Sequence, residues 1–213
     1  MSGVARLEIW SDVACNSGTR LAFADGGDNA PYAMSSTKSL VGQESLAFSI
    51  PVDCDAAAFV KEARVARVWR SDTDFDEWII NTVTLRRDGG GKMDVTCVPV
   101  SYRLSTCGLV PEWQVTPSDK LPILDVGVVQ LSLSTLFTTY LVNNPTVNAV
   151  LPYLAVGTIG SSALIDLSWT SASPRAVIEA AVSAAEIADG VPYDFTLVRN
   201  GTTSYDITIT AVT

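Results

Sequence analysis

One stretch, residues 75–104, constrains the fold more than any other part of the chain. It contains two runs of strand-forming residues, separated by the charged, glycine-rich turn Arg86-Arg87-Asp88-Gly89-Gly90-Gly91-Lys92. After the turn, Met93, Val95 and Cys97 alternate with polar residues, which is the period of a strand with one face in water. The stretch therefore predicts a long β-hairpin with a flexible, charged tip.

The rest of the chain predicts further strands and a smaller number of helices. Strands are expected at residues 4–10, 45–51, 65–70 and 163–169, and short or longer helices at 55–60, 133–143 and 174–188. The last helix has Ser173 as its N-cap, Pro174 at its first position and Gly190 after its end. Near the end of the chain, Asn200-Gly201 lies between two alternating runs and predicts a hairpin whose two turn residues both take positive φ.

These elements predict a mainly β fold with minor α content, an α+β chain. A break rich in proline, residues 108–117, separates a β-rich first part from a second part that mixes strands and helices. We expect two domains, residues 1–110 and 111–213, and place the helices near 133–143 and 174–188 in the second.

Composition disfavours several functions. The 213 residues carry a net charge of −9, whereas binding to nucleic acid phosphates or to an anionic membrane needs an excess of lysine and arginine. The chain has no histidine, so a Ser-His-Asp or Cys-His catalytic site is excluded, and an enzyme would depend on carboxylates, lysine or tyrosine. We expect a non-enzymatic protein without stable nucleic-acid binding and without a membrane span.

No metal or cofactor site is predicted. Cys15, Cys54, Cys97 and Cys107 lack the local spacing of a zinc motif, and with no secretion signal we expect them to stay reduced in a cytoplasm. The acidic run Asp72-Thr73-Asp74-Phe75-Asp76-Glu77 resembles the start of an EF-hand loop. Glu77 stands where that loop needs glycine, and position 12 is valine, so a solvated turn is the preferred interpretation.

Two features are candidates for contact with another subunit. The hairpin tip is not a phosphate-binding loop, because it joins strand to strand and lacks the required spacing; it is either a plain loop or a charged contact. Of the tryptophans, Trp69, Trp78 and Trp169 fit a core role, while Trp113 is either an interface anchor or a site for carbohydrate stacking. The candidate contact residues are Arg86, Arg87, Gly89, Gly90, Gly91, Lys92 and Trp113.

Several segments together resemble a family of bacteriophage proteins. They are Leu46-Ala47-Phe48-Ser49-Ile50-Pro51, Ala66-Arg67-Val68-Trp69, Phe75-Asp76-Glu77-Trp78-Ile79-Ile80 and Val95-Thr96-Cys97-Val98-Pro99-Val100-Ser101-Tyr102-Arg103-Leu104. Their order is similar to that of the amino-terminal region of tail hub proteins, the tail-tip or tail-associated lysin family related to baseplate hubs. The segment Ser173-Pro174-Arg175-Ala176-Val177-Ile178 is similar to the helix before that family's closing hairpin.

The resemblance implies two β-barrel-like domains and a structural role in the virion. Such hubs are homotrimers at the tail tip that contact the distal tail protein or tail tube on one side. On the other side they carry a fibre, lysin or spike protein and serve host attachment and genome ejection. The resemblance also implies assembly in the cytoplasm of the bacterial host. Two alternatives remain open, a hexameric distal tail protein and a β-module that binds host glycans, as does the question of whether the chain is the hub part of a longer protein.

Overall fold

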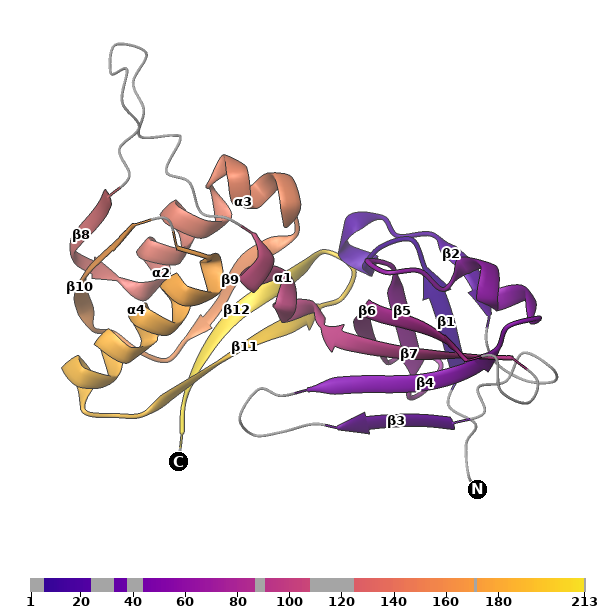
Figure 1. Ribbon diagram of the computed structural model, residues 1–213. Helices are drawn as coiled ribbons and strands as arrows, with labels where there is room; N and C mark the ends of the chain where they lie inside the picture. The colour runs from indigo at the N-terminus through magenta and orange to yellow at the C-terminus, as the bar shows by residue number, and fades with distance from the viewer. Residues whose placement is uncertain are drawn as a thin grey trace, which may run out of the picture. The chain divides into compact units, whose positions relative to one another are not determined.

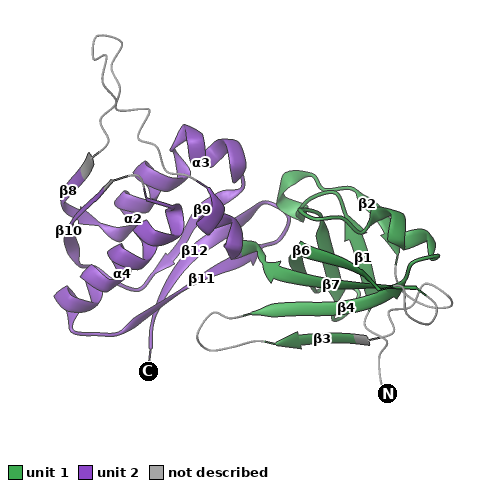
Figure 2. Ribbon diagram, viewed as in Figure 1, with its two compact units in different colours: residues 1–100 green, residues 101–213 purple. Residues whose placement is uncertain are grey.

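The chain folds into two compact units, residues 1–100 and 101–213 (Figure 2). The computed structural model describes residues 6–23, 33–37, 44–86, 91–107, 125–170 and 172–212. Of these described residues, 48% are in strands and 28% in helices, so the fold is mainly β. The sequence placed the domain boundary between residues 110 and 111, whereas the units divide after Val100. The difference arises because α1 (Arg103–Thr106) packs against the long helix α4 (Pro174–Asp189) of unit 2.

Unit 1 is built on a seven-stranded sheet in which every pair of neighbouring strands is antiparallel. The order across the sheet is β2-β1-β5-β6-β7-β4-β3 (Figure 1). The strands are β1 Arg6–Trp10, β2 Arg20–Phe23, β3 Ala33–Thr37, β4 Ser45–Pro51, β5 Val65–Trp69, β6 Phe75–Arg86 and β7 Lys92–Pro99. The 3₁₀ turns η1 Ala14–Asn16 and η3 Asp55–Phe59 complete the unit's regular structure within the described residues, and η4 Val100–Tyr102 spans the boundary to unit 2.

The predicted hairpin is formed by β6 and β7 at the middle of this sheet. Their register runs from Trp78 opposite Pro99 to Arg86 opposite Lys92, with one irregularity between Ile80 and Thr82. The second strand is shorter than residues 75–104 suggested, because it ends at Pro99 and the chain turns helical. Proline has no N–H to donate to a ladder, so it is a physical reason for the strand to stop there.

One face of the sheet carries the hydrophobic core of unit 1. Every second residue of the inner strands points into it, as the period of a strand requires. The core includes Leu7, Ile9, Leu46, Phe48, Ile50, Ala66, Trp78, Ile80, Met93, Val95 and Cys97, together with Cys54, Ala56, Ala57 and Val60 from η3 and its flanks. Cys97 is a small core residue, as its position in the alternating run predicted, and burial raises the pKa of its thiol to about 12.

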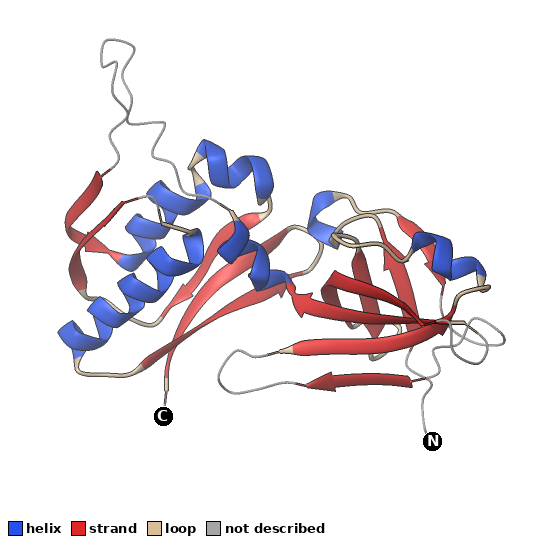
Figure 3. Ribbon diagram, in the orientation of Figure 1, coloured by secondary structure: helices blue, strands red, loops and turns tan. Residues whose placement is uncertain are grey.

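Unit 2 combines helices with two small sheets, and Figure 3 shows the helices concentrated in this part of the chain. Its elements after α1 are β8 Asp125–Ser132, α2 Leu133–Phe137, the π-helical turn η6 Thr138–Val142, α3 Pro145–Val150, β9 Leu154–Ile159, β10 Leu164–Thr170, α4 Pro174–Asp189, β11 Tyr193–Asn200 and β12 Ser204–Ala211. One sheet pairs β10 with β8, and the other has the order β11-β12-β9. None of the sheets in the described residues closes into a barrel, so the barrel-like domains are not confirmed.

The two predicted longer helices are present. Around 133–143, α2 continues into η6 and ends at Asn143, as expected. In α4, the Ser173 side chain accepts the Ala176 N–H and Gly190 takes the left-handed conformation after the helix. The sequence missed α3, which starts immediately at Pro145. Buried Asn144 caps it by accepting the N–H groups of residues 146 and 147.

The closing hairpin forms, but its turn differs from the prediction. Asn200 is still a strand residue and pairs with Ser204, so the loop has three residues, Gly201 to Thr203. Among the described residues of this turn, only Gly201 has a positive φ, of 58°. Glycine pays no steric penalty there, whereas asparagine does not need the left-handed region because it stays in the ladder. The expectation that both Asn200 and Gly201 have positive φ was therefore wrong.

Candidate functional site

The described end of the β6–β7 hairpin is more ordered than a flexible tip would be. Arg86 Nε lies 2.5 Å from Asp94 Oδ2 across the strand pair, and Asp94 also accepts a hydrogen bond from the Ser49 hydroxyl. Lys92 is exposed and lies opposite both Arg86 and Pro51 in the ladder. Of the other candidate contact residues, Arg87, Gly89, Gly90 and Trp113 lie outside the described residues.

Gly91 has a specific backbone role. Its φ is +65°, a region that residues with a Cβ rarely adopt. Its carbonyl oxygen accepts the Val52 N–H at 3.1 Å, and a Cβ added to it would lie 2.4 Å from Val52 Cγ2. Gly91 is therefore needed for a sharp, close approach between the hairpin and the loop after β4, and the interpretation of all three glycines as flexible does not hold for this one.

Only the first part of the acidic run is the solvated turn that the sequence analysis preferred, because Phe75, Asp76 and Glu77 already belong to β6 and Glu77 is buried. Asp72 and Asp74 are exposed in the connection between β5 and β6. Arg70 pairs with Asp76 and lies 4.0 Å from Asp74, and its hydrogen bond to Asp76 raises the pKa of the guanidinium. Glu77 points away from this turn into a different site. Within the described ranges, no group of three or more Asp, Glu, Cys or His residues is placed to hold a metal ion.

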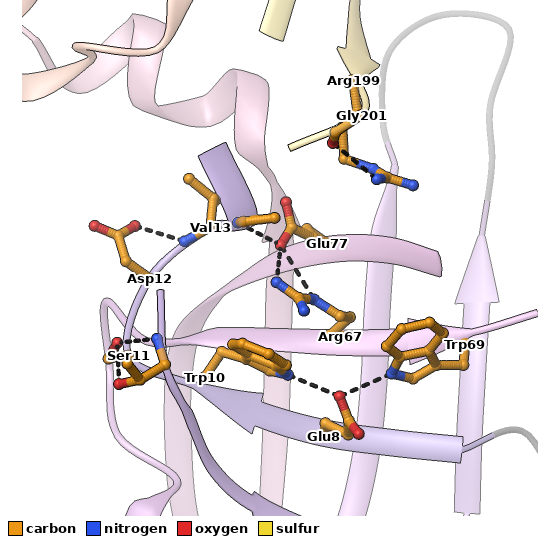
Figure 4. Close-up of polar contacts among 12 residues, drawn as sticks. Glu8, Trp10, Ser11, Asp12, Val13, Arg67, Trp69, Glu77, Arg199 and Gly201 are labelled. Carbon is orange, nitrogen blue, oxygen red and sulfur yellow. Dashed lines mark hydrogen bonds and ion pairs between the residues drawn. The ribbon is translucent and has the colours of Figure 1, made fainter. Parts of the chain in front are cut away.

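The second face of the unit 1 sheet carries a layer of arginines, carboxylates and aromatic rings that the sequence analysis missed. β1 contributes Glu8 and Trp10, β5 contributes Arg67 and Trp69, and β6 contributes Glu77 (Figure 4). The register makes this layer, because Glu8 lies opposite Arg67 and Arg67 lies opposite Glu77. Three neighbouring strands thus place acid, base and acid in one row across the sheet.

Guanidinium groups and rings alternate along this layer. Arg67 lies 3.6 Å from the Trp10 ring centroid and 4.2 Å from that of Phe75. Phe75 contacts Trp69, with 4.7 Å between centroids, and Arg6 lies 4.5 Å from the Trp69 ring. Cation–π contacts of this kind contribute about 0.5–2 kcal/mol each, with the larger values in dry surroundings.

Glu8 is a fully buried carboxylate whose hydrogen-bonding groups come from three side chains. Its Oε2 accepts the indole N–H groups of Trp10 at 2.9 Å and Trp69 at 2.8 Å, and its Oε1 accepts the Arg6 guanidinium at 2.8 Å. Burial acts to raise the pKa of Glu8, but the hydrogen bonds from Trp69, Trp10 and Arg6 together outweigh it and hold the pKa below its ordinary value. The group is therefore a charged, fixed part of the fold.

The second acid of the row fastens a loop to the sheet. Glu77 Oε1 accepts two hydrogen bonds from Arg67, at 2.7 and 3.2 Å, and a third from the backbone N–H of Ala14 at 2.8 Å. Ala14 begins η1 in the loop between β1 and β2, where Val13 is completely buried. The loop's base is closed by Ser11 and Thr19, whose backbone groups bond at 2.9 Å. Glu77 thus ties the loop between β1 and β2 to β6.

Hydrogen bonds hold both carboxylates of this layer in place. Glu8 accepts them at both of its oxygens, and Glu77 Oε1 accepts three. A sequence signal for this layer did exist, since charged and aromatic residues alternate in Arg6-x-Glu8-x-Trp10, Arg67-x-Trp69 and Phe75-x-Glu77. That alternation gives the face of each strand, but not which strands are neighbours.

The tryptophans of the described residues behave largely as predicted. Trp78 and Trp169 are buried, 3% and 9% exposed, and Trp169 packs edge-on against Tyr140. Trp69 is half-buried and belongs to the polar layer instead of the apolar core. None of the described helices is both long and apolar enough to cross a bilayer.

The fold is similar to that of a solved phage tail protein. No protein-family model matches the sequence, and no curated protein matches it either. The chain is similar in structure to the prophage tail protein gp18 from Listeria monocytogenes EGD-e, with a TM-score of 0.53 over 94% of this chain and 50% of that one. At 10% sequence identity, this likeness shows a shared fold and no more.

A second tail protein, from Neisseria meningitidis MC58, aligns with 95% of this chain and 45% of its own length, at 11% identity and a TM-score of 0.42. The chain therefore spans about half the length of each of these tail proteins.

Proposed function

We propose that the chain is a structural protein of a bacteriophage tail tip, forming a trimeric hub ring in the virion. One observation carries the proposal: both units together, 94% of the chain, align with the prophage tail protein gp18. A match confined to one unit would be weaker support, because small β-sheet units occur in many unrelated proteins. The order of segments that resembles the hub family supports the more specific placement at the tip.

In this proposal the ring joins the tail tube or the distal tail protein to a distal fibre, lysin or spike protein. Assembly takes place in the cytoplasm of the bacterial host, and the ring then serves host attachment and genome ejection. The chain contributes shape instead of catalysis. The lack of histidine supports this role, as does the use of the buried carboxylates Glu8 and Glu77 to fasten strands and a loop.

Copy number in the assembled tail tests the proposal. Tails would be purified, and the chain would be counted per tail end by quantitative mass spectrometry and located by cryo-electron microscopy. Three copies at the tip support the hub. Six copies in the layer above would identify the hexameric distal tail protein instead, and absence from the tail would refute both.

A further inference from the structure

Strand β11 is the longest regular sheet edge in the described residues. It pairs with β12 on one side, from Tyr193 opposite Ala211 to Asn200 opposite Ser204, without a bulge. The pairings that involve β2, β8, β9 and β10 all contain a register irregularity. Proteins protect edge strands with bulges, prolines or lysines, and β11 has none of these. It is therefore the edge best prepared to accept another strand.

The backbone register shows which groups would bond to that strand. Val212 donates its N–H to the Pro192 carbonyl at 2.9 Å, and antiparallel neighbours exchange such bonds at every second residue. Asp194, Thr196 and Val198 accordingly turn their backbone groups toward β12. Phe195 and Leu197 turn theirs to the outer edge, where Tyr193 already donates its N–H to Glu186 Oε1 at 2.9 Å. No described group bonds to the outer N–H groups of Phe195 and Leu197.

The side chains at this edge are also incompletely covered. Phe195 and Leu197 are half-buried, whereas Ile207 and Ile209 on β12 are completely buried. A strand added beside β11 would cover the exposed part of this apolar row, as β11 covers β12.

The β11 edge is acidic. Asp194 is exposed and has no ion-pair partner among the described residues, and α4, which packs on β11, presents Glu179, Glu186 and Asp189. β11 itself carries one cation, the half-buried Arg199. Arg175 offsets Glu179 alone, in an exposed pair at 2.7 Å. Two β11 edges facing one another would bring like charges together, which is unfavourable.

The edge strand β2 (Arg20–Phe23) of unit 1 is short and irregularly paired, so it is the shorter partner in such a contact, and it has the opposite charge. Its Arg20 side chain is 46% exposed and the nearby Arg6 side chain is 38% exposed, and both contact the same single carboxylate, Glu8. Phe23, itself 42% exposed, lies 3.9 Å from the Arg20 guanidinium. β2 thus presents an excess positive charge beside an exposed ring.

We propose that β11 of one copy of this chain accepts β2 of a second copy as an added strand. Asp194 then faces Arg20 and Arg6, and Phe23 lies beside Val198, which is 48% exposed and on the same face of β11 as Asp194. The contact joins two different surfaces, so it repeats head to tail and closes into a ring where the rotation allows. This inference rests on the proposed ring function and names the surfaces that build it.

The test is a charge exchange on the purified full chain, with association measured by analytical ultracentrifugation and native mass spectrometry. Asp194→Arg and Arg20→Glu should each raise the dissociation constant at least tenfold, about 1.4 kcal/mol. The double variant should regain most of the affinity, because the attractive pair is restored with its signs reversed. Asp72→Arg and Lys61→Glu, at exposed positions outside both strands, make the same charge changes and should leave association unaltered.

A third variant tests the backbone contact independently of charge. Leu197→Pro removes an outward N–H without breaking a bond to β12, and it should abolish association while circular dichroism stays native. A wild-type oligomer that none of these variants weakens would overturn this inference and leave the ring proposal intact. A chain that stays monomeric at its highest soluble concentration, or a double variant that is not rescued, would also overturn the inference.

Discussion

Replacing Arg67 by methionine should destabilise unit 1 far more than an exposed arginine would. The Arg67 and Glu77 side chains are 4% and 0% exposed, so removing the guanidinium leaves a buried carboxylate with only the Ala14 N–H from the loop among the bonds described above. Methionine keeps an apolar stem between Trp10 and Phe75, so the change isolates the charge.

The expected loss is about 3 kcal/mol. Breaking one side of a buried ion pair typically costs about 3–5 kcal/mol, and the hydrogen bond that Glu77 keeps from the Ala14 N–H places the loss toward the lower end. Replacing both partners, as Arg67→Met with Glu77→Leu, removes the stranded charge. That double variant should lose only about 1 kcal/mol, chiefly the hydrogen bond to the Ala14 N–H.

Native-state hydrogen exchange of the β5 and β6 amides is the appropriate measurement, because it reports the opening of unit 1 whatever unit 2 does. Amides that exchange by global opening should exchange roughly a hundredfold faster in Arg67→Met at pH 7. Arg175→Met, which breaks an exposed pair on α4, serves as the control and should cost no more than about 0.5 kcal/mol. A loss below about 1 kcal/mol for Arg67→Met, or a double variant as unstable as the single one, would refute this account of the layer.

Three further predictions follow from the same structure. Gly91→Ala should destabilise unit 1 by about 1–3 kcal/mol, because it adds a Cβ at positive φ and 2.4 Å from Val52 Cγ2. Gly190→Ala, at a φ of +68° with open space around it, should lower the stability measured by thermal unfolding by less. Because the pKa of Glu8 is depressed in the folded protein, its contribution to stability is present above its ordinary pKa and lost as pH falls through the folded pKa. The free energies of unfolding in urea should therefore differ between wild type and Glu8→Gln at pH 7 and become similar in acid. An equal gap at both pH values would contradict this sign. Deleting Gly89 and Gly90 while keeping Gly91 should impair incorporation into tails more than thermal stability if the hairpin tip contacts a neighbouring subunit, and normal incorporation would show that the tip is only a loop.

The sequence predicted those elements that are determined by residues close to one another in the chain. Ser173, Pro174 and Gly190 delimit α4 because capping and the left-handed end depend on residues close in sequence. The β6–β7 hairpin was predictable for the same reason, since its strands are joined by a short connection. The closing hairpin shows the limit, because loop length depends on the pairing of Asn200 with Ser204, and the Asn-Gly pair alone does not determine it.

The polar layer was not predictable because it depends on which strands are neighbours. In sequence, Glu8 is 61 residues from Trp69, and Ala14 is 63 residues from Glu77. Read alone, Glu77 belonged to an acidic turn, and its burial opposite Arg67 follows only from the antiparallel register of β5 and β6. The α3 cap was missed because Asn143-Asn144-Pro145 both ends one helix and begins the next. The sequence analysis interpreted these residues only as a helix end.

The layer also explains why a chain without histidine buries so much charge in unit 1. Burying an ion pair does not by itself favour folding, since apolar residues of the same volume often do as well. The acid–base–acid row specifies which strands are neighbours and in which register they pair. Glu8 requires β1 beside β5, and Glu77 requires β6 and the loop between β1 and β2 in one register. A one-residue slip of β5 would turn Arg67 and Trp69 toward the apolar core, so Glu77 would lose its guanidinium partner and Glu8 would lose the Trp69 N–H. The proposed function requires the protein to present fixed sheet edges to neighbouring copies, and a fixed strand register keeps β2 and its arginines in a defined position.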